Sequence, residues 1–391
     1  MEKLNKANYP NHPITQSPNQ LNSLLICSHC VLPKNFPGIR FNAEGVCNFC
    51  QDYQAKKAKI ALDKERYRQK FLNLLAQLNE PKQPNKFILC SAKPISPGPN
   101  EPNKPHSRSY DVLMAFSGGK DSSYTLKVLR KDYGLKILAL TFNNGFLSSS
   151  ALRNAQTICE SLQIDHLIVS PNAETLYQAF RESIAPEMYP LKALERASSV
   201  CNTCMNLVKS YLLKTAIEMG IPLIAYGWSP GQAPVQSSVM KWNLPMIRQT
   251  QAVLTNTIQK FMGENLNGFK LSDRHFEILK MESDVSKGPF LYNVHPLAFL
   301  DYDEDRIIKS VKELGWQSPV DTDSNSTNCR LNAFGINTHQ EQFGFHPYVF
   351  EIAGLVRGGH MAREEGLKKL STPPDEKIIQ EVKNKLGLLR K

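Results

Sequence analysis

The segment SGGKDS, residues 117–122, limits what this chain can fold into more than any other part of the sequence. It follows an apolar run at 110–116 that is typical of a buried strand, and it precedes a helical pattern from about residue 122 to residue 131. Glycines let a backbone approach an anion closely, and the free N–H groups at the start of a helix attract negative charge. The segment therefore predicts a loop that binds phosphate groups between a strand and a helix.

Each residue type in this loop is expected to make a different contact with ATP or Mg²⁺. The glycines admit the phosphates, the serines donate hydroxyl groups, the lysine supplies a cation, and the aspartate is a ligand for Mg²⁺. The spacing differs from the G-x4-G-K-S/T pattern of a Walker A loop. The predicted binding residues are Ser117, Gly118, Gly119, Lys120, Asp121 and Ser122, and Lys120 and Asp121 are also predicted to act in catalysis.

Strand-like and helix-like segments alternate after the loop. Strands are predicted at 136–142, 166–170 and 221–227, and helices at 149–162, 173–184 and 205–220. This alternation predicts an α/β fold in which helices cover both faces of a doubly wound parallel sheet. Ligands bind such sheets beyond the carboxyl ends of the strands, and SGGKDS lies at such an end. After Trp228 the chain is predicted to be mainly helical, with helices at 303–314 and from Thr372 to about Gly387.

These patterns predict five regions. Residues 1–22 are polar and predict a disordered lead-in, 23–55 a zinc unit with four cysteines, and 56–109 a helix followed by a Pro-rich linker. Residues 110–235 are predicted to form the ATP-binding domain, and 236–391 a mainly helical substrate region.

The net charge of +11 and the lack of a long apolar run bear on partners and location. A membrane helix needs about 18 consecutive apolar residues, so none is predicted. The N-terminal segment also lacks the apolar stretch of a secretory signal, and we therefore expect a cytoplasmic protein. The positive charge favours a polyanion such as tRNA, or else a basic surface that suits ATP and phosphorylated substrates.

Four of the nine cysteines form two Cys-x2-Cys pairs, Cys27 with Cys30 and Cys47 with Cys50. In a cytoplasmic chain, cysteines in such pairs are more often metal ligands or catalytic thiols than disulfides. Two pairs supply the four thiolates of a structural zinc site, which stabilises a small unit that lacks a core of its own. The alternatives are unligated thiols, or a redox or iron–sulfur role.

A further pair, Cys201 and Cys204, lies just before the predicted helix at 205–220 and is expected near the carboxyl edge of the sheet. Cys329 is a candidate third ligand. Three thiolates could hold a 4Fe–4S cluster with one iron left open, so Cys201, Cys204 and Cys329 are predicted as catalytic and cluster-binding residues. The alternatives are a thiol or persulfide pair without a cluster, a structural pair, and a Cys329 that is only a buried apolar residue.

The segment MAFSGGKDSSYTLKVL resembles the PP-loop of the ATP pyrophosphatase superfamily, which has the adenine nucleotide α-hydrolase-like, or HUP-like, fold. The resemblance covers about residues 110–228, and it implies that Gly227, at the end of the strand at 221–227, helps to bind ATP. It implies cleavage of ATP between the α and β phosphates, transfer of AMP to a substrate oxygen and release of pyrophosphate. A nitrogen or sulfur nucleophile then displaces AMP.

PP-loop enzymes that thiolate tRNA bases are similar to this chain in combining a Cys-x2-Cys pair in about this place with a distant cysteine. The resemblance implies a sulfurtransferase that acts on tRNA, depends on an iron–sulfur cluster and takes sulfur from a donor protein. Their N-terminal zinc unit is also similar in one such group.

A second resemblance connects both ends of the chain. The segment CSHCVLPKNFPGIRFNAEGVCNFC looks like the start of bacterial N-acetyl sugar amidotransferases, and FHPYVFEIAGLVRGGHMAREEGLKKL looks like their C-terminal region. It implies a ligase that acts on a nucleotide-linked sugar for surface polysaccharides, with ammonia from a glutaminase partner. Such an enzyme has no obvious use for the three later cysteines. A third hypothesis is a zinc-containing binding module that ATP regulates, and a homodimer is a candidate assembly.

Four further residues each have two interpretations. Arg357 and Arg363 are predicted either to bind a phosphate or carboxylate of the substrate or to lie on a solvated helix face. Trp228 and Trp316 are predicted either to stack on a base or sugar or to pack in the interior.

Overall fold

The computed structural model describes residues 25–79, 110–262, 266, 268–282, 290–323, 326 and 328–389. The predicted lead-in at 1–22 and the predicted Pro-rich linker lie outside the described residues. Within the described part of the chain, no helix combines the length and the apolar character that crossing a membrane requires.

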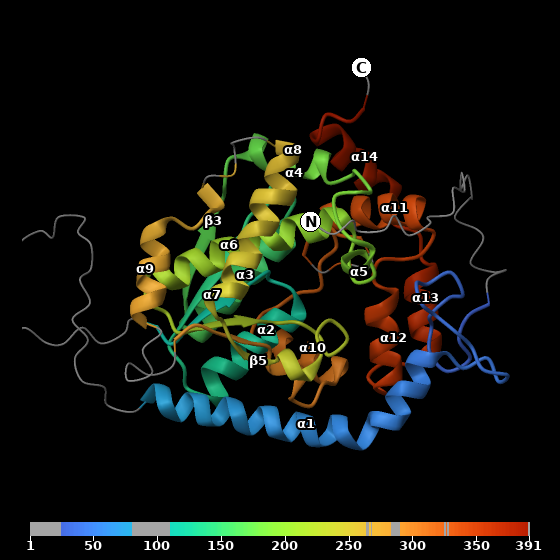
Figure 1. Ribbon diagram of the computed structural model, residues 1–391, viewed down its shortest axis with the longest axis horizontal. Helices are drawn as coiled ribbons and strands as arrows, with labels where there is room; N and C mark the ends of the chain where they lie inside the picture. Colours follow the sequence, from blue (N-terminus) through green and yellow to red (C-terminus); the bar gives the residue numbers. More distant parts are fainter. Residues whose placement is uncertain are drawn as a thin grey trace, which may run out of the picture.

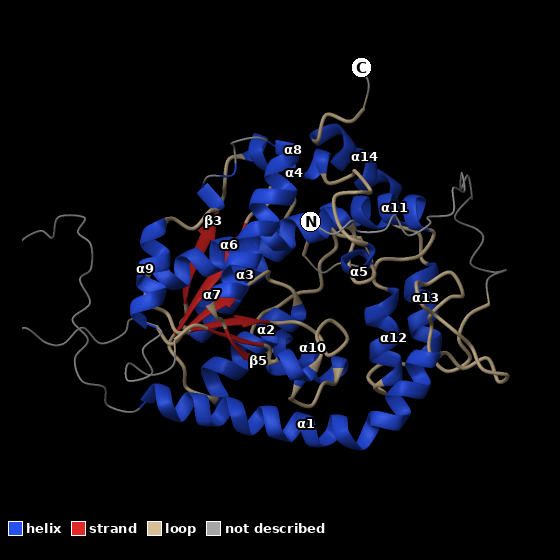
Figure 2. Ribbon diagram, viewed as in Figure 1, coloured by secondary structure: helices blue, strands red, loops and turns tan. Residues whose placement is uncertain are grey.

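Six strands form one sheet in the order β3-β2-β1-β4-β6-β5 (Figure 2). Only β5, at one edge, runs antiparallel to its neighbour. The strands are β1 (Val112–Ala115), β2 (Ile137–Phe142), β3 (Asp165–Val169), β4 (Leu223–Tyr226), β5 (Val239–Lys241) and β6 (Tyr292–Val294). The order reverses between β1 and β4, which makes their carboxyl ends the expected place for a ligand. The predicted α/β fold with a mainly parallel sheet is confirmed.

Alternate side chains of the strands belong to two apolar layers, one on each face of the sheet. In β1, Leu113 belongs to one layer, and Val112 and Met114 belong to the other. This follows from the two-residue period of a strand. Because both faces are buried, the strands appear in the sequence as continuous apolar runs, which is why they were recognisable there.

Helices cover both faces of the sheet (Figures 1 and 2). One layer contains side chains from α1 (Asn48–Asn79), α2 (Lys120–Lys127), α3 (Ser149–Leu162) and α10 (Glu304–Lys312). The other contains side chains from α4 (Ala173–Glu182), α6 (Ser199–Glu218), α7 (Leu244–Ala252), α9 (Asp273–Glu282), α11 (Leu331–Phe343) and α14 (Glu376–Lys385). Two short helices, α5 (Leu191–Leu194) and α8 (Gln259–Met262), lie in the connections.

A third apolar cluster joins the N-terminal part of the described chain to helices that precede α14. The four-cysteine unit, residues 25–50, packs against α12 (Val349–Arg357) and α13 (Arg363–Ser371), with Leu32 and Phe36 among the buried residues. The Phe36 ring stacks on Phe350 at 5.6 Å between centroids. Helix α1 leaves this unit and runs along one side of the molecule (Figure 1).

Two helix starts differ from the prediction because capping side chains set them elsewhere. The Ser198 hydroxyl accepts a hydrogen bond from Cys201 N at 3.1 Å, so α6 begins at Ser199. The prediction that Cys201 and Cys204 precede the helix was therefore wrong, because both lie within it. Asp375 caps α14 in the same way, and the predicted start at Thr372 was too early. The sheet also continues past residue 235 through β5 and β6, and the predicted domain boundary there stays a prediction.

Phe71 tests how α1 is held on the sheet, because its side chain is fully buried in the layer beneath the helix. We expect Phe71→Ala to lower the free energy of unfolding by about 3–5 kcal/mol, since it leaves a cavity. Leu62→Ala is the matched control, because Leu62 is 73% exposed on the same helix and its loss should change stability by less than about 0.5 kcal/mol. Urea unfolding followed by circular dichroism measures both variants. Equal losses would contradict the packing of α1 on the sheet.

Candidate functional site

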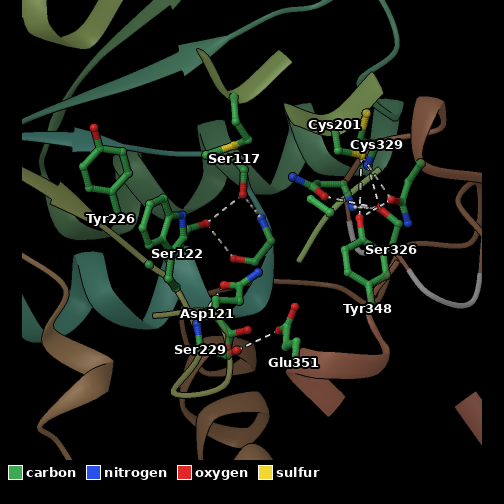
Figure 3. Close-up of a pocket in the computed structure, with 18 of the residues that line it drawn as sticks. Ser117, Asp121, Ser122, Cys201, Tyr226, Ser229, Ser326, Cys329, Tyr348 and Glu351 are labelled. Atoms are coloured by element: carbon green, nitrogen blue, oxygen red, sulfur yellow. Dashed lines mark hydrogen bonds between the residues drawn. The ribbon is translucent and has the colours of Figure 1, made fainter. Parts of the chain in front are cut away.

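A cavity of about 630 Å³ lies at the carboxyl ends of β1, β2 and β4. Side chains from the SGGKDS loop, α6, the segment before α11, and α12 line it (Figure 3). This is the point where the strand order reverses, and ligands bind sheets of this kind at such points. The cavity therefore holds the predicted loop and the predicted cysteines together.

Two close backbone contacts determine the shape of the loop. Gly118 has a φ of +73°, and a Cβ atom there would lie 2.2 Å from the Ala151 carbonyl oxygen. Gly227, directly after β4, lies against the first turn of α2, where a Cβ atom would lie 2.4 Å from Ser122 Cα. Trp316 Nε1 donates a hydrogen bond to the Gly118 carbonyl oxygen at 2.9 Å, so this tryptophan packs in the interior and fastens the loop.

The start of α2 is open to an anion. The helix begins at Lys120, and in the described chain no side chain caps it. The hydroxyl oxygens of Ser117 and Ser122 lie 3.1 Å apart at its entrance. The unpaired N–H groups of a first helical turn and the helix dipole both favour negative charge, so this end of α2 can bind phosphate groups.

Lys120 is held by three oxygen-bearing groups. Its Nζ lies 2.9 Å from Asp121 Oδ2, 3.1 Å from the Tyr302 hydroxyl oxygen and 3.4 Å from Glu304 Oε1. Burial alone would lower the pKa of Lys120, but these neighbours together raise that pKa above its ordinary value. The lysine therefore stays protonated. Carboxylate oxygens are also the ligands that Mg²⁺ prefers, and two carboxylates are present here. Neither Tyr302 nor Glu304 was predicted from the sequence.

Cys201 and Cys204 face the cavity from α6, where residues three apart share one side of the helix. Cys329 reaches them on a loop that pairs with the residues after β2, because it forms an isolated bridge with Leu147. The Asn144 side-chain nitrogen lies 3.4 Å from Cys204 Sγ and 3.5 Å from Cys329 Sγ. The three predicted cysteines therefore meet on one wall of the cavity, with Cys201 and Cys329 visible together in Figure 3.

The environment of these thiols keeps them protonated in the absence of a metal. Burial raises the pKa of all three, that of Cys329 to about 11, and the neighbouring thiols raise the pKa of Cys204 further. A protonated thiol is a poor nucleophile, which disfavours a thiol or persulfide pair acting alone. Metal coordination deprotonates a thiol outright, so a cluster fits this donor set.

Helix α12 and the residue that precedes it each contribute one polar side chain to the same cavity. The Tyr348 hydroxyl group lies 3.8 Å from Cys201 Sγ and hydrogen-bonds to the Asn332 side chain. The Ser229 hydroxyl group donates to Glu351 Oε1 at 2.8 Å. Burial raises the pKa of Glu351 to about 7. Neither residue was predicted from the sequence, and a glutamate such as Glu351 in an amphipathic helix has the pattern of a surface residue.

The four-cysteine unit could hold one metal ion. Its sulfur atoms are buried and all lie within 4.8 Å of one another, with 3.8 Å between Cys27 and Cys50 and 3.7 Å between Cys30 and Cys47. Thiolates at 2.3 Å around a tetrahedral ion lie about 3.8 Å apart. Among the described residues, these four are the one group of three or more ligand side chains that converge on a single ion.

Arg357 and Arg363 support this unit. Arg357 Nη1 donates to Cys30 Sγ at 3.6 Å, and Arg363 donates from Nη2 to the Cys27 carbonyl oxygen and from Nε to that of Cys30, both at 3.0 Å. These contacts differ from the predicted solvated face, and the predicted contact with a phosphate or carboxylate of the substrate stays a prediction. Trp228 stacks on His295 at 4.5 Å between ring centroids and also lines the cavity.

Comparison with known proteins places the loop in a family. Residues 111–221 match the family model described as "Queuosine biosynthesis protein QueC", a PP-loop family. The chain carries a PP-loop of the ATP pyrophosphatase superfamily. The members of this superfamily are enzymes that use ATP, so the predicted recognition and the predicted enzyme class are confirmed at this level.

More distant relatives are similar over most of the chain. The uncharacterized protein MJ1599 of Methanocaldococcus jannaschii is 22% identical over 285 residues, which are 73% of this chain and 81% of that protein.

The U34-tRNA thiolase NcsA of Methanococcus maripaludis, solved with its 4Fe–4S cluster, is 17% identical over 73% of this chain and 75% of its own, with a TM-score of 0.33. The NMN synthetase of Francisella tularensis is 12% identical over 72% and 89%, with a TM-score of 0.32. The NH3-dependent NAD synthetase of Campylobacter jejuni is 15% identical over 53% and 84%, with a TM-score of 0.26. Structural likeness of this size says nothing about what this chain acts on.

Gly227→Ala tests the contact between the turn after β4 and the start of α2. The added Cβ has no room against backbone, and overpacking of this kind costs about 1–3 kcal/mol. We expect binding of Mg²⁺ with a non-hydrolysable ATP analogue to weaken roughly tenfold or more, measured by calorimetry. Gly268→Ala is the control, because a Cβ atom there meets open space. Unchanged affinity in Gly227→Ala would show that the loop does not depend on this contact.

Metal removal tests the four-cysteine unit. We expect the purified protein to contain about one ion bound by this unit, and we expect a chelator to remove it with a clear fall in Tm, because the unit has little core of its own. Cys47→Ser should have the same effect, while Cys159→Ala, which alters a buried thiol of α3 outside both cysteine groups, should retain the ion. Metal analysis and thermal unfolding measure both properties. An unchanged Tm after complete removal would contradict a structural role.

Proposed function

We propose that this chain is an ATP-dependent sulfurtransferase, which adenylates a substrate oxygen, releases pyrophosphate and puts sulfur in place of that oxygen. The observation that supports this most directly is that Cys201, Cys204 and Cys329 line the same cavity as the PP-loop. Sulfur held by these residues would share one chamber with the activated carbon atom.

The three cysteines are proposed to hold a 4Fe–4S cluster, which would leave one iron without a protein ligand. They suit a cluster better than a single ion, since they do not converge as the four-cysteine unit does. The open iron would carry the sulfur for transfer. Cys201, Cys204 and Cys329 would hold the cluster. Asn144 lies beside the Cys204 thiol and Tyr348 beside the Cys201 thiol, so both would help to position these ligands.

The remaining parts of the site have proposed tasks in binding. The SGGKDS loop and Lys120 bind the phosphates of ATP, Asp121 binds Mg²⁺, and the four-cysteine unit holds structural Zn²⁺. Transfer RNA is the proposed substrate, in keeping with the net charge of +11, and a sulfur-donor protein is the proposed partner. A cytoplasmic location and a homodimer are part of the same proposal.

Anaerobic purification tests the cluster. We expect a brown protein with broad absorption near about 400 nm, iron and acid-labile sulfide. Cys201→Ser, Cys204→Ser and Cys329→Ser should each lose the colour, whereas Cys159→Ala should keep it, because Cys159 is a buried residue of α3 that packs with Phe71 in the other apolar layer. Incubation with MgATP, sulfide and unfractionated tRNA should then release pyrophosphate and form a thiolated nucleoside. A colourless protein without iron would refute the cluster.

A second candidate is an amidotransferase-like ligase that acts on a nucleotide-linked sugar with ammonia from a glutaminase partner. The observation that favours it is that the two segments resembling such enzymes pack together, since residues 27–50 and helices α12 and α13 form one apolar cluster. Pyrophosphate release with UDP-N-acetylglucosamine and ammonia, undiminished in Cys201→Ser, would favour this candidate over sulfur transfer.

A further inference from the structure

Glu351 has no task in the sulfur chemistry or in phosphate binding, yet it lies in the cavity. It belongs to the first turn of α12, which packs closely on the turn after β4: a Cβ atom on Gly231 would lie 2.5 Å from the Glu351 carbonyl oxygen. The Ser229 hydroxyl group, from the same turn, fixes the carboxyl group at 2.8 Å. Figure 3 shows Glu351 between Asp121 and Tyr348, at the side of the cavity between the loop and the cysteine wall.

The surroundings of Glu351 bring its pKa close to neutral pH, where both its protonated and its ionised form are present. Burial raises its pKa to about 7, Asp121 acts in the same direction, and the Ser229 hydrogen bond and Lys120 act against them. The titratable and charged groups that line the cavity with it are Lys120, Asp121, Arg196, Cys201, Cys204, Lys209, Tyr226, Tyr302, Glu304, Cys329, Tyr348 and Lys369. A group of this kind can take up a proton and release it again within one turnover.

Adenylation makes different demands on different acceptors. A carboxylate acceptor attacks the α phosphorus without losing a proton, and a second carboxylate beside it would repel it. An amide or lactam carbonyl oxygen is a weak nucleophile, and its adduct carries a positive charge unless the neighbouring N–H group loses its proton. A buried proton acceptor beside the loop is therefore useful for the second class of acceptor and unhelpful for the first.

We propose that Glu351 is a catalytic residue that accepts the N–H proton of the acceptor, and that the acceptor is an amide or lactam group. As the carbonyl oxygen bonds to the α phosphorus, the bond from that phosphorus to the bridging oxygen breaks and pyrophosphate leaves. The electron pair of the N–H bond forms the C=N bond, and the proton passes to the Glu351 carboxylate. The proposal rests on the adenylation half of the proposed function and is independent of the group that later displaces AMP.

The test follows pyrophosphate release from MgATP by the full-length, metal-loaded enzyme with three probes. Unfractionated tRNA offers lactam groups, UDP-N-acetylglucosamine offers a sugar amide as well, and aspartate offers carboxylates. We expect release with one of the first two and none with aspartate. Glu351→Gln should lower that rate by about 100-fold or more, which is the usual contribution of a general base. Glu341→Gln, which alters an exposed glutamate of α11, is the matched control and should keep the full rate.

Two further readouts separate a proton acceptor from a structural residue. Binding of α,β-methylene-ATP should be unchanged in Glu351→Gln, so the loss should appear in kcat. The rate of the parent enzyme should rise with pH through about 7, because the carboxylate is the active form, and this rise should vanish in the variant. Should Glu351→Gln fail to fold, Ser229→Ala keeps the carboxyl group, and losing the hydrogen bond to its charged form should move the midpoint of the pH profile upward.

Each of the following outcomes would contradict a particular part of the two proposals. Four results would each refute the role of Glu351. Two concern Glu351→Gln: a rate near that of the parent, or a loss of ATP-analogue binding equal to the loss of rate. The other two are a pH profile that does not move in Ser229→Ala, and pyrophosphate release with aspartate as fast as with the amide probes. Pyrophosphate release without a thiolated product would refute sulfur transfer and leave the role of Glu351 intact. No release with any probe would refute both.

Discussion

The contact of the turn after β4 with the first turn of α2 is the constraint on which the cavity depends. A Cβ atom at Gly227 would lie 2.4 Å from Ser122 Cα, so the turn after β4 and the first turn of α2 approach each other as closely as backbone allows. This closeness sets the open end of α2 beside the turn at 229–232, and that turn in turn supports α12. One backbone contact therefore positions both the open start of α2 and helix α12, which carries Glu351.

Local signals explain why much of this could be predicted. The loop between an apolar run and a helical pattern needs only neighbouring residues to be recognised, and the buried strands appear as continuous apolar runs. The spacing of Cys27, Cys30, Cys47 and Cys50 is likewise a local signal, because two Cys-x2-Cys turns bring together four thiols that could hold one ion. Cys201, Cys204 and Cys329 were expected near the loop, and they meet there.

What the sequence did not indicate depends on contacts between distant segments. Tyr302 and Glu304 reach Lys120 from the start of α10, and Arg357 reaches Cys30 across more than three hundred residues. No neighbouring residue marks such partners, and a glutamate such as Glu351 has the same local pattern as a surface glutamate. The start of α6 is different, because Ser198 is a good capping residue and a local signal was present in the sequence but was not used.

The packing of the four-cysteine unit on α12 and α13 has a consequence for how the chain is made. Ribosomal synthesis proceeds from the N-terminus, so the unit emerges well before the helices that cover it. In that interval an apolar face that includes Leu32 and Phe36 has no partner, and a bound ion would be its main source of order. The cavity also lacks one wall until α12 follows, so the PP-loop can fold into its sheet long before a complete site exists. A complete site therefore forms only after residues 349–357 have been made, and a shorter nascent chain cannot act.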